Sequence, residues 1–546
     1  MAHVPYISVQ PTYPAAFADV SQSILPQETA WVSIYAQNAP NASVHGKLLL
    51  EPCVAKTRGS AEEQRNTAGG VALTVKDGEF AIERVTGSYA DFTVRTPKGN
   101  DGSMTNLQDR SARKRSNQIH AGPTKVRFSR RHIQTCIKTR AGISALDISP
   151  ISNNLYVVGG DDGALYVGRT NQGDRCSENV LPQDDSTRAI TTGEPLDEGE
   201  RIEKLAQAKM AARQAQTERE RVLPLTGHVG DVRSARFFPS GEVILTTSSD
   251  LTARIFSALE DSNPRTFKGH KRAILCSEII DRGREVLTAG ADGTVRLWDV
   301  GANKQIGLFA SERFSSINAL VLQRHSADAT GGNSQGKLLA TALSSGRIEL
   351  HDLGARRSAA LIPALKAFPP GSPPAASDIW DQSAPGPLFS LDWDSERHII
   401  AAGSREGVIA LHDDRMLSSS LSSGSGNARE GEATQTDDAP STDGRSTPRS
   451  LLGCWRRNGA AINDLRLVSS NTAASSLDIV VATSDGLPYR ASLRPILTGQ
   501  RDENFSVAPE VVEEYAEWDC DSVEKARLDP QGRVWLAGTD GLLRRY

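Results

Sequence analysis

Two adjacent segments of the chain, residues 225–257 and 267–299, are copies of one pattern. The first reads LTGHVGDVRSARFFPSGEVILTTSSDLTARIFS and the second reads FKGHKRAILCSEIIDRGREVLTAGADGTVRLWD. Aligned without a gap, they match at four positions that lie 42 residues apart: His228 with His270, Thr246 with Thr288, Asp250 with Asp292, and Phe256 with Trp298. This period, with Gly-His near the start and Trp-Asp at the end, predicts a four-stranded propeller blade.

The matched residue types predict a buried polar relay inside each blade. Asp accepts a hydrogen bond from His, His meets the Thr hydroxyl, and the Trp indole N–H meets the same hydroxyl, so each group is satisfied. A catalytic triad is an alternative interpretation, but a Thr buried in a strand is not an exposed nucleophile. The relay is expected at His228, Thr246 and Asp250 in the first copy, and at His270, Thr288, Asp292 and Trp298 in the second.

Five weaker copies of the strand-turn-strand core bring the number of predicted blades to seven. Each has a β-rich run, a tight turn of the Asp-Gly or Ser-Gly type, and an alternating run. They occupy residues 143–169, 317–352, 388–413, 462–493 and 523–546. The last copy stops after its third strand, while residues 132–140 (HIQTCIKTR) form an unassigned alternating segment before the first copy. We expect that segment to supply the missing outer strand and close the ring.

The predicted fold class is therefore all-β, with a seven-bladed WD-repeat propeller at 132–546. Short strand-like runs such as WVSIYA and GVALTV predict a small β-rich domain at 1–105, and 106–131 is interpreted as a linker. Its basic run, DRSARKRSNQ, is interpreted as solvated, with a nuclear-localisation signal as the alternative. Two insertions interrupt the propeller: a helix at 197–222, rich in strong helix formers, and a disordered Ser-rich segment at 418–450.

Composition and motifs exclude several classes of function. Lys and Arg number 62 against 66 for Asp and Glu, so no global basic field favours nucleic acid or an anionic membrane. The six cysteines form no CxxC pair, which argues against a structural metal and a disulfide framework. The chain has no P-loop, HExxH motif or nucleophile elbow, so we expect no enzymatic activity and no cofactor. Without a signal peptide or membrane span, it is expected to be a cytoplasmic and nuclear protein, monomeric by itself.

The long insertions predict which face of the propeller binds a partner. They fall mainly in first-to-second and third-to-fourth strand connections, which share one face and leave the other open. The turns between second and third strands lie on the open face and carry acids in six blades, although Asp-Gly is also simply a good tight turn. The segment EVVEEYAEWDCDSVE approaches the same face. We expect an acidic patch that selects a basic protein surface, formed by Asp161, Asp162, Glu406, Asp485, Glu513, Glu514, Glu517, Asp519 and Asp540, with Arg233 and Arg272 as local anchors for a carboxylate.

The second and third blades carry more specific motifs. GHVGDV is followed by FFPSG, and IIDRGR is followed by a full Trp-Asp blade and SSINAL, over residues 223–322. In these motifs the chain resembles the proteasomal ATPase-associated factor family of WD-repeat proteins. The resemblance implies an assembly chaperone of the proteasome regulatory particle whose seven-bladed propeller binds the C-terminal domain of an ATPase subunit and delays its docking on the core particle. The sequence departs from the family pattern at Ile255-Phe256-Ser257 and in its insertions, which leaves the identity of that subunit open.

A substrate receptor of a cullin-type ubiquitin ligase is the alternative function. The segment LHDDR at 411–415 approximates the Trp-Asp-x-Arg docking box, but His412 stands where the box has Trp. An enzymatic propeller is a third interpretation, and against it His351 and His412 merely occupy the Trp position of degenerate blades.

Overall fold

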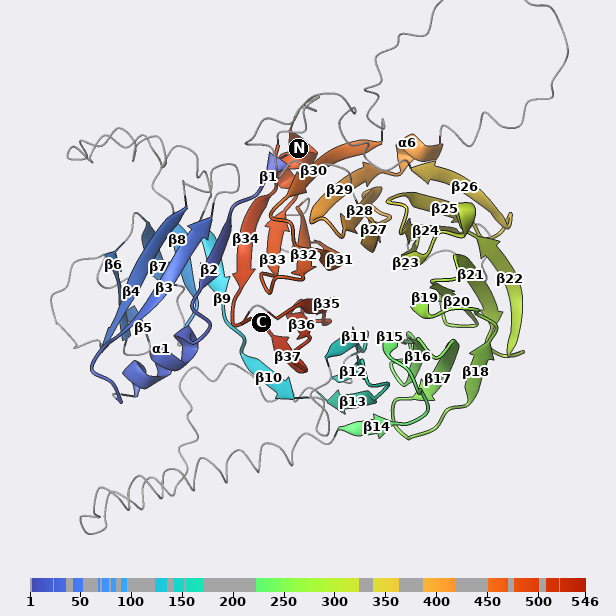
Figure 1. Ribbon diagram of the computed structural model, residues 1–546, viewed down its shortest axis with the longest axis horizontal. Coiled ribbons are helices and arrows are strands. Elements are labelled where there is room, and N and C mark those ends of the chain that lie inside the picture. The colour runs from blue at the N-terminus through green and yellow to red at the C-terminus, as the bar shows by residue number, and fades with distance from the viewer. Residues whose placement is uncertain are drawn as a thin grey trace, which may run out of the picture.

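Seven four-stranded units stand in a closed ring around a central axis, and a smaller domain lies at one side of the ring (Figure 1). The protein is therefore a seven-bladed β-propeller with an N-terminal domain. The fold comes from a computed structural model, which describes residues 2–22, 24–35, 43–52, 67–68, 71–77, 80–84, 90–95, 123–134, 142–151, 154–169, 222–323, 337–362, 386–418, 450–469, 476–499, 507–519 and 521–546.

Each blade is built from four antiparallel strands that follow one another from the central axis outward. Blades one to four contain β11 (Ile143–Ile148), β12 (Leu155–Gly160), β13 (Leu165–Arg169) and β14 (Leu223–Leu225); β15 (Val232–Phe237), β16 (Val243–Ser248), β17 (Thr252–Ser257) and β18 (Arg265–Lys268); β19 (Ile274–Ile280), β20 (Glu285–Gly290), β21 (Thr294–Asp299) and β22 (Lys304–Ala310); and β23 (Ile317–Leu322), β24 (Leu338–Leu343), β25 (Ile348–Asp352) and β26 (Arg357–Ile362). Blades five to seven contain β27 (Leu388–Asp394), β28 (Ile399–Ser404), β29 (Val408–Asp413) and β30 (Leu451–Arg456); β31 (Ile462–Ser469), β32 (Leu477–Thr483), β33 (Tyr489–Ser492) and β34 (Glu510–Tyr515); and β35 (Val523–Leu528), β36 (Val534–Gly538), β37 (Leu542–Arg545) and β10 (Arg131–Gln134). Within the described residues, short helices at η2 (Glu312–Phe314), α6 (Arg415–Ser418) and α7 (Arg494–Thr498) connect strands of the propeller.

The second strand of each blade is at least as buried as any other strand of that blade. The residues of β12, β20, β28 and β36 are buried throughout, and these strands read LYVVGG, EVLTAG, IIAAGS and VWLAG. Both faces of such a strand are covered by neighbouring blades, so a continuous run of apolar and small residues replaces the alternation of a half-exposed strand. Burial between blades therefore holds the ring together.

The ring is closed by an early segment of the chain. Strand β10 pairs antiparallel with β37, from Arg131 opposite Arg545 to Gln134 opposite Leu542. The N–H of Arg130 also donates to the carbonyl of Arg545, at 2.8 Å. The predicted closure is thus confirmed for residues 132–134, while 135–140 lie outside the described residues.

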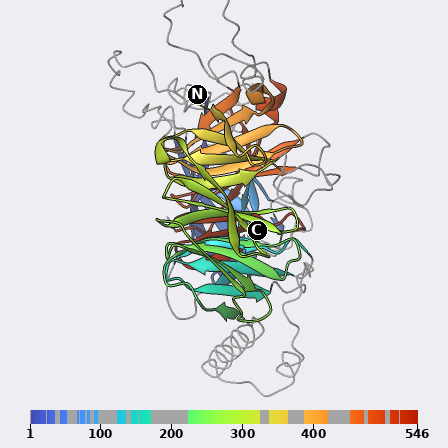
Figure 2. The same cartoon turned by 90° about the vertical axis from the view of Figure 1, so that its right-hand side faces the viewer.

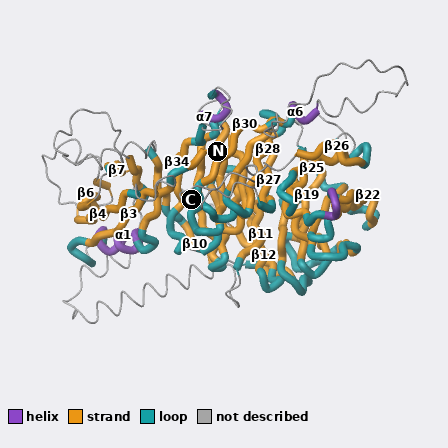
Figure 3. The backbone as a smooth tube through the Cα atoms, turned by 45° about the horizontal axis from the view of Figure 1, so that its top comes forward, coloured by secondary structure: helices purple, strands orange, loops and turns teal. Residues whose placement is uncertain are grey.

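The N-terminal domain is a sheet with one helix packed on it. Its strands are β2 (Tyr6–Val9), β3 (Glu28–Tyr35), β4 (Val44–Pro52), β5 (Thr67–Ala68) and β6 (Val71–Asp77), and its helix is α1 (Tyr13–Ser21), shown in purple in Figure 3. Pro14 at the start of α1 suits the first turn, where its missing N–H costs nothing. Tyr13 at the start of α1 is fully buried and stacks on Phe128, with ring centroids 4.9 Å apart. This aromatic contact ties the helix to the segment that leads into the propeller.

Two sheets of the propeller continue into N-terminal strands. β7 (Ala81–Arg84), β8 (Phe92–Arg95) and β9 (Thr124–Arg127) extend blade six, with β9 parallel to β34, and β1 (Ala2–His3) pairs in parallel with β30 of blade five. Assignment of the whole of 106–131 to a linker is therefore wrong, because part of it forms β9 and the start of β10. Seen from the side in Figure 2, the N-terminal domain lies behind the blades.

The two predicted insertions fall almost entirely outside the described residues. Of the helix expected at 197–222, only Val222 is described; of the Ser-rich segment at 418–450, only Ser418 and Ser450 are. Ser450 is buried and its carbonyl accepts a hydrogen bond from the N–H of Asp413, at 2.7 Å. The chain thus re-enters blade five at Ser450.

Candidate protein-interaction face

The order of the strands defines two faces of the propeller. In an antiparallel blade, turns between second and third strands share a face with the loops that enter the next blade. We call this the entry face. Its described residues are the turns 161–164, 249–251, 291–293, 344–347, 405–407, 484–488 and 539–541 and the loops 142, 226–231, 269–273, 311–316, 386–387, 457–461, 516–519 and 521–522.

Blade three holds the complete polar relay at the edge of this face. His270 Nδ1 lies 2.9 Å from Asp292 Oδ2, and His270 Nε2 lies 2.8 Å from Thr288 Oγ1. The indole N–H of Trp298 donates to the same Thr288 oxygen, at 2.9 Å. Asp292 also accepts from the backbone N–H of Lys271, at 3.0 Å. The relay therefore fixes the entry loop against the turn between the second and third strands.

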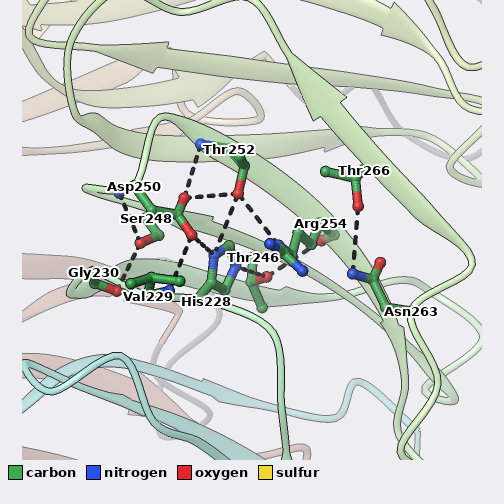
Figure 4. A network of polar contacts seen from close by, with 10 residues as sticks. All are labelled: His228, Val229, Gly230, Thr246, Ser248, Asp250, Thr252, Arg254, Asn263 and Thr266. Carbon is green, nitrogen blue, oxygen red and sulfur yellow. Dashed lines mark hydrogen bonds and ion pairs between the residues drawn. The ribbon is translucent and has the colours of Figure 1, made fainter.

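Blade two repeats the relay without its tryptophan (Figure 4). His228 lies 2.8 Å from both Asp250 Oδ2 and Thr246 Oγ1, and Phe256 replaces the indole. Burial lowers the pKa of His228 below its usual value. Burial opposes ionisation of Asp250, yet hydrogen bonds from Thr252 and His228 bring its pKa below the ordinary range. Both shifts favour a neutral imidazole beside a carboxylate.

We expect Trp298→Phe to lower the free energy of unfolding by about 1–2 kcal/mol, because the change removes one buried hydrogen bond and some apolar contact. Phe256 at the matching position shows that a blade of this protein accommodates the smaller ring. Urea denaturation of the two proteins measures the difference. An unchanged midpoint would show that the indole N–H contributes nothing to stability.

The fourth and fifth blades carry buried histidines at the tryptophan position. His351 and His412 are both buried, and burial lowers the pKa of each, that of His412 to about 4. His412 Nδ1 lies 3.3 Å from the Ser450 hydroxyl. Neither histidine is exposed to a substrate, which agrees with their interpretation as replacements for tryptophan.

The buried His412 predicts acid sensitivity. An unfolded histidine takes up a proton near pH 6.5, whereas the folded state does so only near 4, so stability is lost as pH falls between these values. From pH 6.5 to pH 5 this one group costs about 2 kcal/mol. Urea midpoints at the two pH values should therefore differ less for His412→Leu than for the natural protein. Equal pH dependence of the two proteins would contradict the assignment.

The structure brings together only part of the predicted acidic patch. Asp161 and Asp162 in blade one and Asp519 in the loop entering blade seven are exposed on the entry face. Asp540 lies beside them but pairs with Arg544, at 2.6 Å. We call these four residues, which lie over blades seven and one, the acidic sector.

The remaining predicted residues lie elsewhere on the face or are engaged. Asp485 accepts a hydrogen bond from the Asn458 amide, and Glu406 is half-buried in the turn of blade five. Arg233 pairs with Asp231, at 2.7 Å, whereas Arg272 is exposed on the loop entering blade three. These two arginines belong to blades two and three, whereas the acidic sector belongs to blades seven and one.

Glu513 and Glu514 are not surface contacts, and the prediction that they bind a partner is wrong. Both lie on β34 and are buried. Glu513 pairs with Arg127 on β9, at 2.7 Å, and accepts from the Tyr515 hydroxyl, at 3.0 Å. Glu514 pairs with the buried Arg457. The segment EVVEEY is the fourth strand of blade six, and the N-terminal domain covers its outer edge.

Glu517 is engaged in the same way. Its Oε2 accepts a hydrogen bond from the backbone N–H of Ser129, at 3.0 Å. Together with the two buried glutamates on β34, it holds the segment between the N-terminal domain and the ring. Three of the acids assigned to a partner therefore serve the attachment of the protein's own domain.

Sequence reasoning missed a ring of charges around the central axis. The same position of successive inner strands carries Asp147, Arg236, Glu278, Asp392, Arg466 and Arg527, in blades one, two, three, five, six and seven. Neighbours pair around the ring, for example Arg236 with Glu278 at 3.1 Å. Asp147 also accepts a hydrogen bond from the backbone N–H of Phe237 in the next blade. Asp392 likewise accepts one from the backbone N–H of Leu467. An alignment of the inner strands of the blades would have shown these charged residues in one column.

Comparison with known proteins assigns the class of fold. The family described as WD domain, G-beta repeat (WD40) matches residues 219–257 and 262–299, the segments that hold the two relays. The chain therefore contains WD40 repeats, and its fold is a WD-repeat propeller.

Named relatives match over short segments. Over 57 residues the chain is 44% identical to the 26S proteasome regulatory subunit RPN14 of Saccharomyces cerevisiae. This match covers 10% of this chain and 14% of that protein. It is 29% identical over 76 residues to subunit I of eukaryotic translation initiation factor 3 of Drosophila willistoni and 27% identical over 88 residues to that of Xenopus laevis. These matches cover 14% and 16% of this chain, and 24% and 27% of the respective relatives.

Other classes of site would require a cluster of metal ligands or a long apolar helix. Within the described ranges, no group of three or more His, Cys, Asp or Glu side chains is placed to hold a metal ion. No helix in those ranges has the length and apolar character needed to cross a bilayer.

Proposed function

We propose that this protein is an adaptor and assembly chaperone of the proteasome regulatory particle, which binds the C-terminal domain of an ATPase subunit through the entry face and regulates its docking. The observation that carries the proposal is the set of motifs in blades two and three, supported by 44% identity to a proteasome regulatory subunit over 57 residues. The mechanism is reversible occlusion of a surface and requires no chemistry or cofactor. Such a role places the protein in the cytoplasm and nucleus, where proteasomes assemble.

The acidic sector gives this proposal a physical basis. Asp161, Asp162 and Asp519 project from neighbouring connections, and Asp521 is half-buried beside them with its pKa raised, by burial and then by Asp540. The smaller contribution from Asp540 shows that these carboxylates lie close enough to repel one another, and a basic partner surface would relieve that repulsion. Long-range attraction of this kind raises the rate of encounter and orients the partner.

Affinity purification of the full chain, followed by mass spectrometry, tests the proposal. We expect a regulatory-particle ATPase subunit in the eluate, and Asp161→Lys/Asp162→Lys should reduce its yield by about tenfold at low salt and less at high salt. Glu242→Lys/Glu260→Lys is the matched control, because both residues are exposed in loops of the opposite face and the change in net charge is the same. Absence of every ATPase subunit from the eluate would refute the function. An equal loss in both variants would refute the assignment of the face.

A second function rests on a separate observation. The Arg415 side chain is 65% exposed at the start of α6, two residues after the end of β29, and its guanidinium makes two hydrogen bonds to the buried Asp413, at 3.0 and 2.8 Å. This planar, fixed cation at the end of LHDDR favours the docking of a ubiquitin-ligase adaptor. Binding of the purified adaptor to the natural protein but not to Arg415→Ala would establish it, and absence of binding would remove it.

A further inference from the structure

The sign of the charge on the entry face reverses between its two halves. Over blades two to four the acidic side chains are engaged within the protein. Asp231 forms an ion pair with Arg233 and Glu312 forms one with Arg347, while Asp250 and Asp292 are hydrogen-bonded to His228 and His270. Lys271, Arg272 and Arg313 are exposed on the same loops and form no ion pair with any residue that the structure describes. The charges that are exposed on this half of the face without an ion pair are therefore positive, whereas the relay carboxylates of Asp250 and Asp292 are only 11% and 6% exposed.

The same half of the face exposes large apolar side chains. Val229 is 87% exposed and Phe314 is 66% exposed, the two highest values for large apolar residues in the described ranges. Leu251, in the turn of blade two, is 39% exposed. Single exposed apolar residues are ordinary, but three stand on connections of this one half of the face, and two loops of the same half, 269–273 and 311–316, carry the exposed cations, which is typical of a binding surface. We call Val229, Leu251, Lys271, Arg272, Arg313 and Phe314 the basic-apolar patch.

Fixed backbone contacts present the apolar side chains. The N–H of Val229 donates to Asp250 of the relay, at 3.3 Å, so the loop is held while its side chain projects (Figure 4). Arg313 and Phe314 both adopt left-handed backbone, with φ of 53° and 52°. Gly293 permits this loop to lie close, because a Cβ at that position would collide with the carbonyl group of Phe314.

The left-handed pair is informative because bulky residues avoid that conformation. For each such residue, the left-handed conformation is disfavoured by about fivefold or more relative to the right-handed one. It is retained only where surrounding contacts enforce it. Here it places a phenylalanine in solvent. Strain maintained to expose an apolar ring points to a role in binding.

We propose that the basic-apolar patch binds an acidic segment of a partner protein that carries at least one large apolar side chain. A neutral partner would cover Lys271 and Arg272 without replacing the water they lose, which is unfavourable. Carboxylates from the partner would satisfy these cations, while its apolar side chain would cover Phe314, which follows Arg313 on the same loop. Single-stranded nucleic acid fits less well, because its binding sites stack successive bases on several aromatic rings and this patch has one.

The inference goes beyond the proposed function, since it concerns the other half of the entry face and does not require the partner to be an ATPase subunit. A face with acidic and basic halves fixes the orientation of whatever docks across it, because rotation would bring like charges together.

Fluorescence anisotropy with the full chain tests the proposal. The probes are short fluorescein-labelled peptides: one acidic with two leucines, one acidic with serines in place of the leucines, and one with lysines in place of the acids; an oligouridine RNA of the same length is the fourth. We expect the acidic leucine peptide to bind about tenfold more tightly than the other two peptides and the RNA. Equal binding of the serine peptide, or tighter binding of the RNA, would overturn the proposal.

Variants locate the binding on the patch. Lys271→Glu/Arg272→Glu should weaken binding of the acidic leucine peptide by about tenfold at low salt and by less at high salt. Phe314→Ser should weaken binding of this peptide by about fivefold at either salt concentration, since the substitution removes apolar contact alone. Lys304→Glu/Arg357→Glu is the matched control, because both residues are exposed beside loops of the opposite face. Unchanged affinity in both patch variants, or an equal loss in the control, would refute the site.

Discussion

Replacement of Arg457 by alanine should destabilise the protein by about 3–5 kcal/mol, because it leaves the buried carboxylate of Glu514 without a cation. Arg457 is 2% exposed and lies between two aromatic rings, with its guanidinium carbon 4.4 Å from the centre of Tyr489 and 5.2 Å from that of Tyr6. It also donates to the carbonyl of Leu487, at 3.1 Å. Tyr6 belongs to the N-terminal domain and Tyr489 to blade six, so one side chain joins the two.

Chemical denaturation measures this effect, and two further variants separate its causes. Arg457→Met/Glu514→Leu removes both charges and should recover much of the loss, since a well-packed apolar pair often replaces a buried ion pair at little cost. Arg405→Ala removes an exposed arginine from the turn of blade five and should change stability by less than about 0.5 kcal/mol. A loss for Arg457→Ala no larger than for Arg405→Ala would show that Glu514 finds another partner.

The parts of the fold that repeat along the sequence could be predicted from it. The relay of blade three joins residues at most 22 positions apart, and its contacts follow from one period of the repeat. The number of blades follows from the same template. The outer strand of blade seven could be inferred by elimination, because the last copy lacks a strand and an early segment has no assignment.

The site was harder to predict because burial of its acids depends on distant segments. Glu513 meets Arg127 across 386 positions, and no local pattern distinguishes EVVEEY as a covered strand from an exposed acidic connection. Strand β9 was missed for the same reason, since a four-residue strand that pairs in parallel with a distant partner resembles a linker. Position on a face could be inferred from the repeat, but pairing between charges could not.

The difference between the two halves of the entry face, by contrast, has a signal in the sequence. Asp250 and Asp162 occupy equivalent positions of their turns, yet the first is engaged by a histidine and the second is exposed. The sequence does indicate this difference, because only blades two and three have the Gly-His pair that supplies the histidine. An acid in a turn contributes to the surface charge only where its own blade lacks the relay. With that rule, the acidic sector is confined to blades without Gly-His.

Replacement of Arg131–Gln134 by a Gly-Ser segment of equal length should have the largest effect of all, because these residues are the outer strand that closes the ring. The change weakens four residue pairs with β37 and exposes the edge of blade seven. At about 1 kcal/mol for each backbone hydrogen bond, together with lost burial, the cost approaches the whole stability of about 5–15 kcal/mol typical of a folded domain. We expect loss of cooperative unfolding and aggregation through the free edge.

Hydrogen exchange of the β37 amides measures this closure directly, since an opened ring leaves them accessible to solvent. Deletion of Ala2–His3 is the matched control, because β1 also adds to an outer edge, that of blade five, but blade five has four strands of its own without it. The control should leave β37 protected and the unfolding cooperative. If β37 stays protected when β10 is replaced, the stability of the ring comes from burial between blades, and the N-terminal segment serves only to attach its domain.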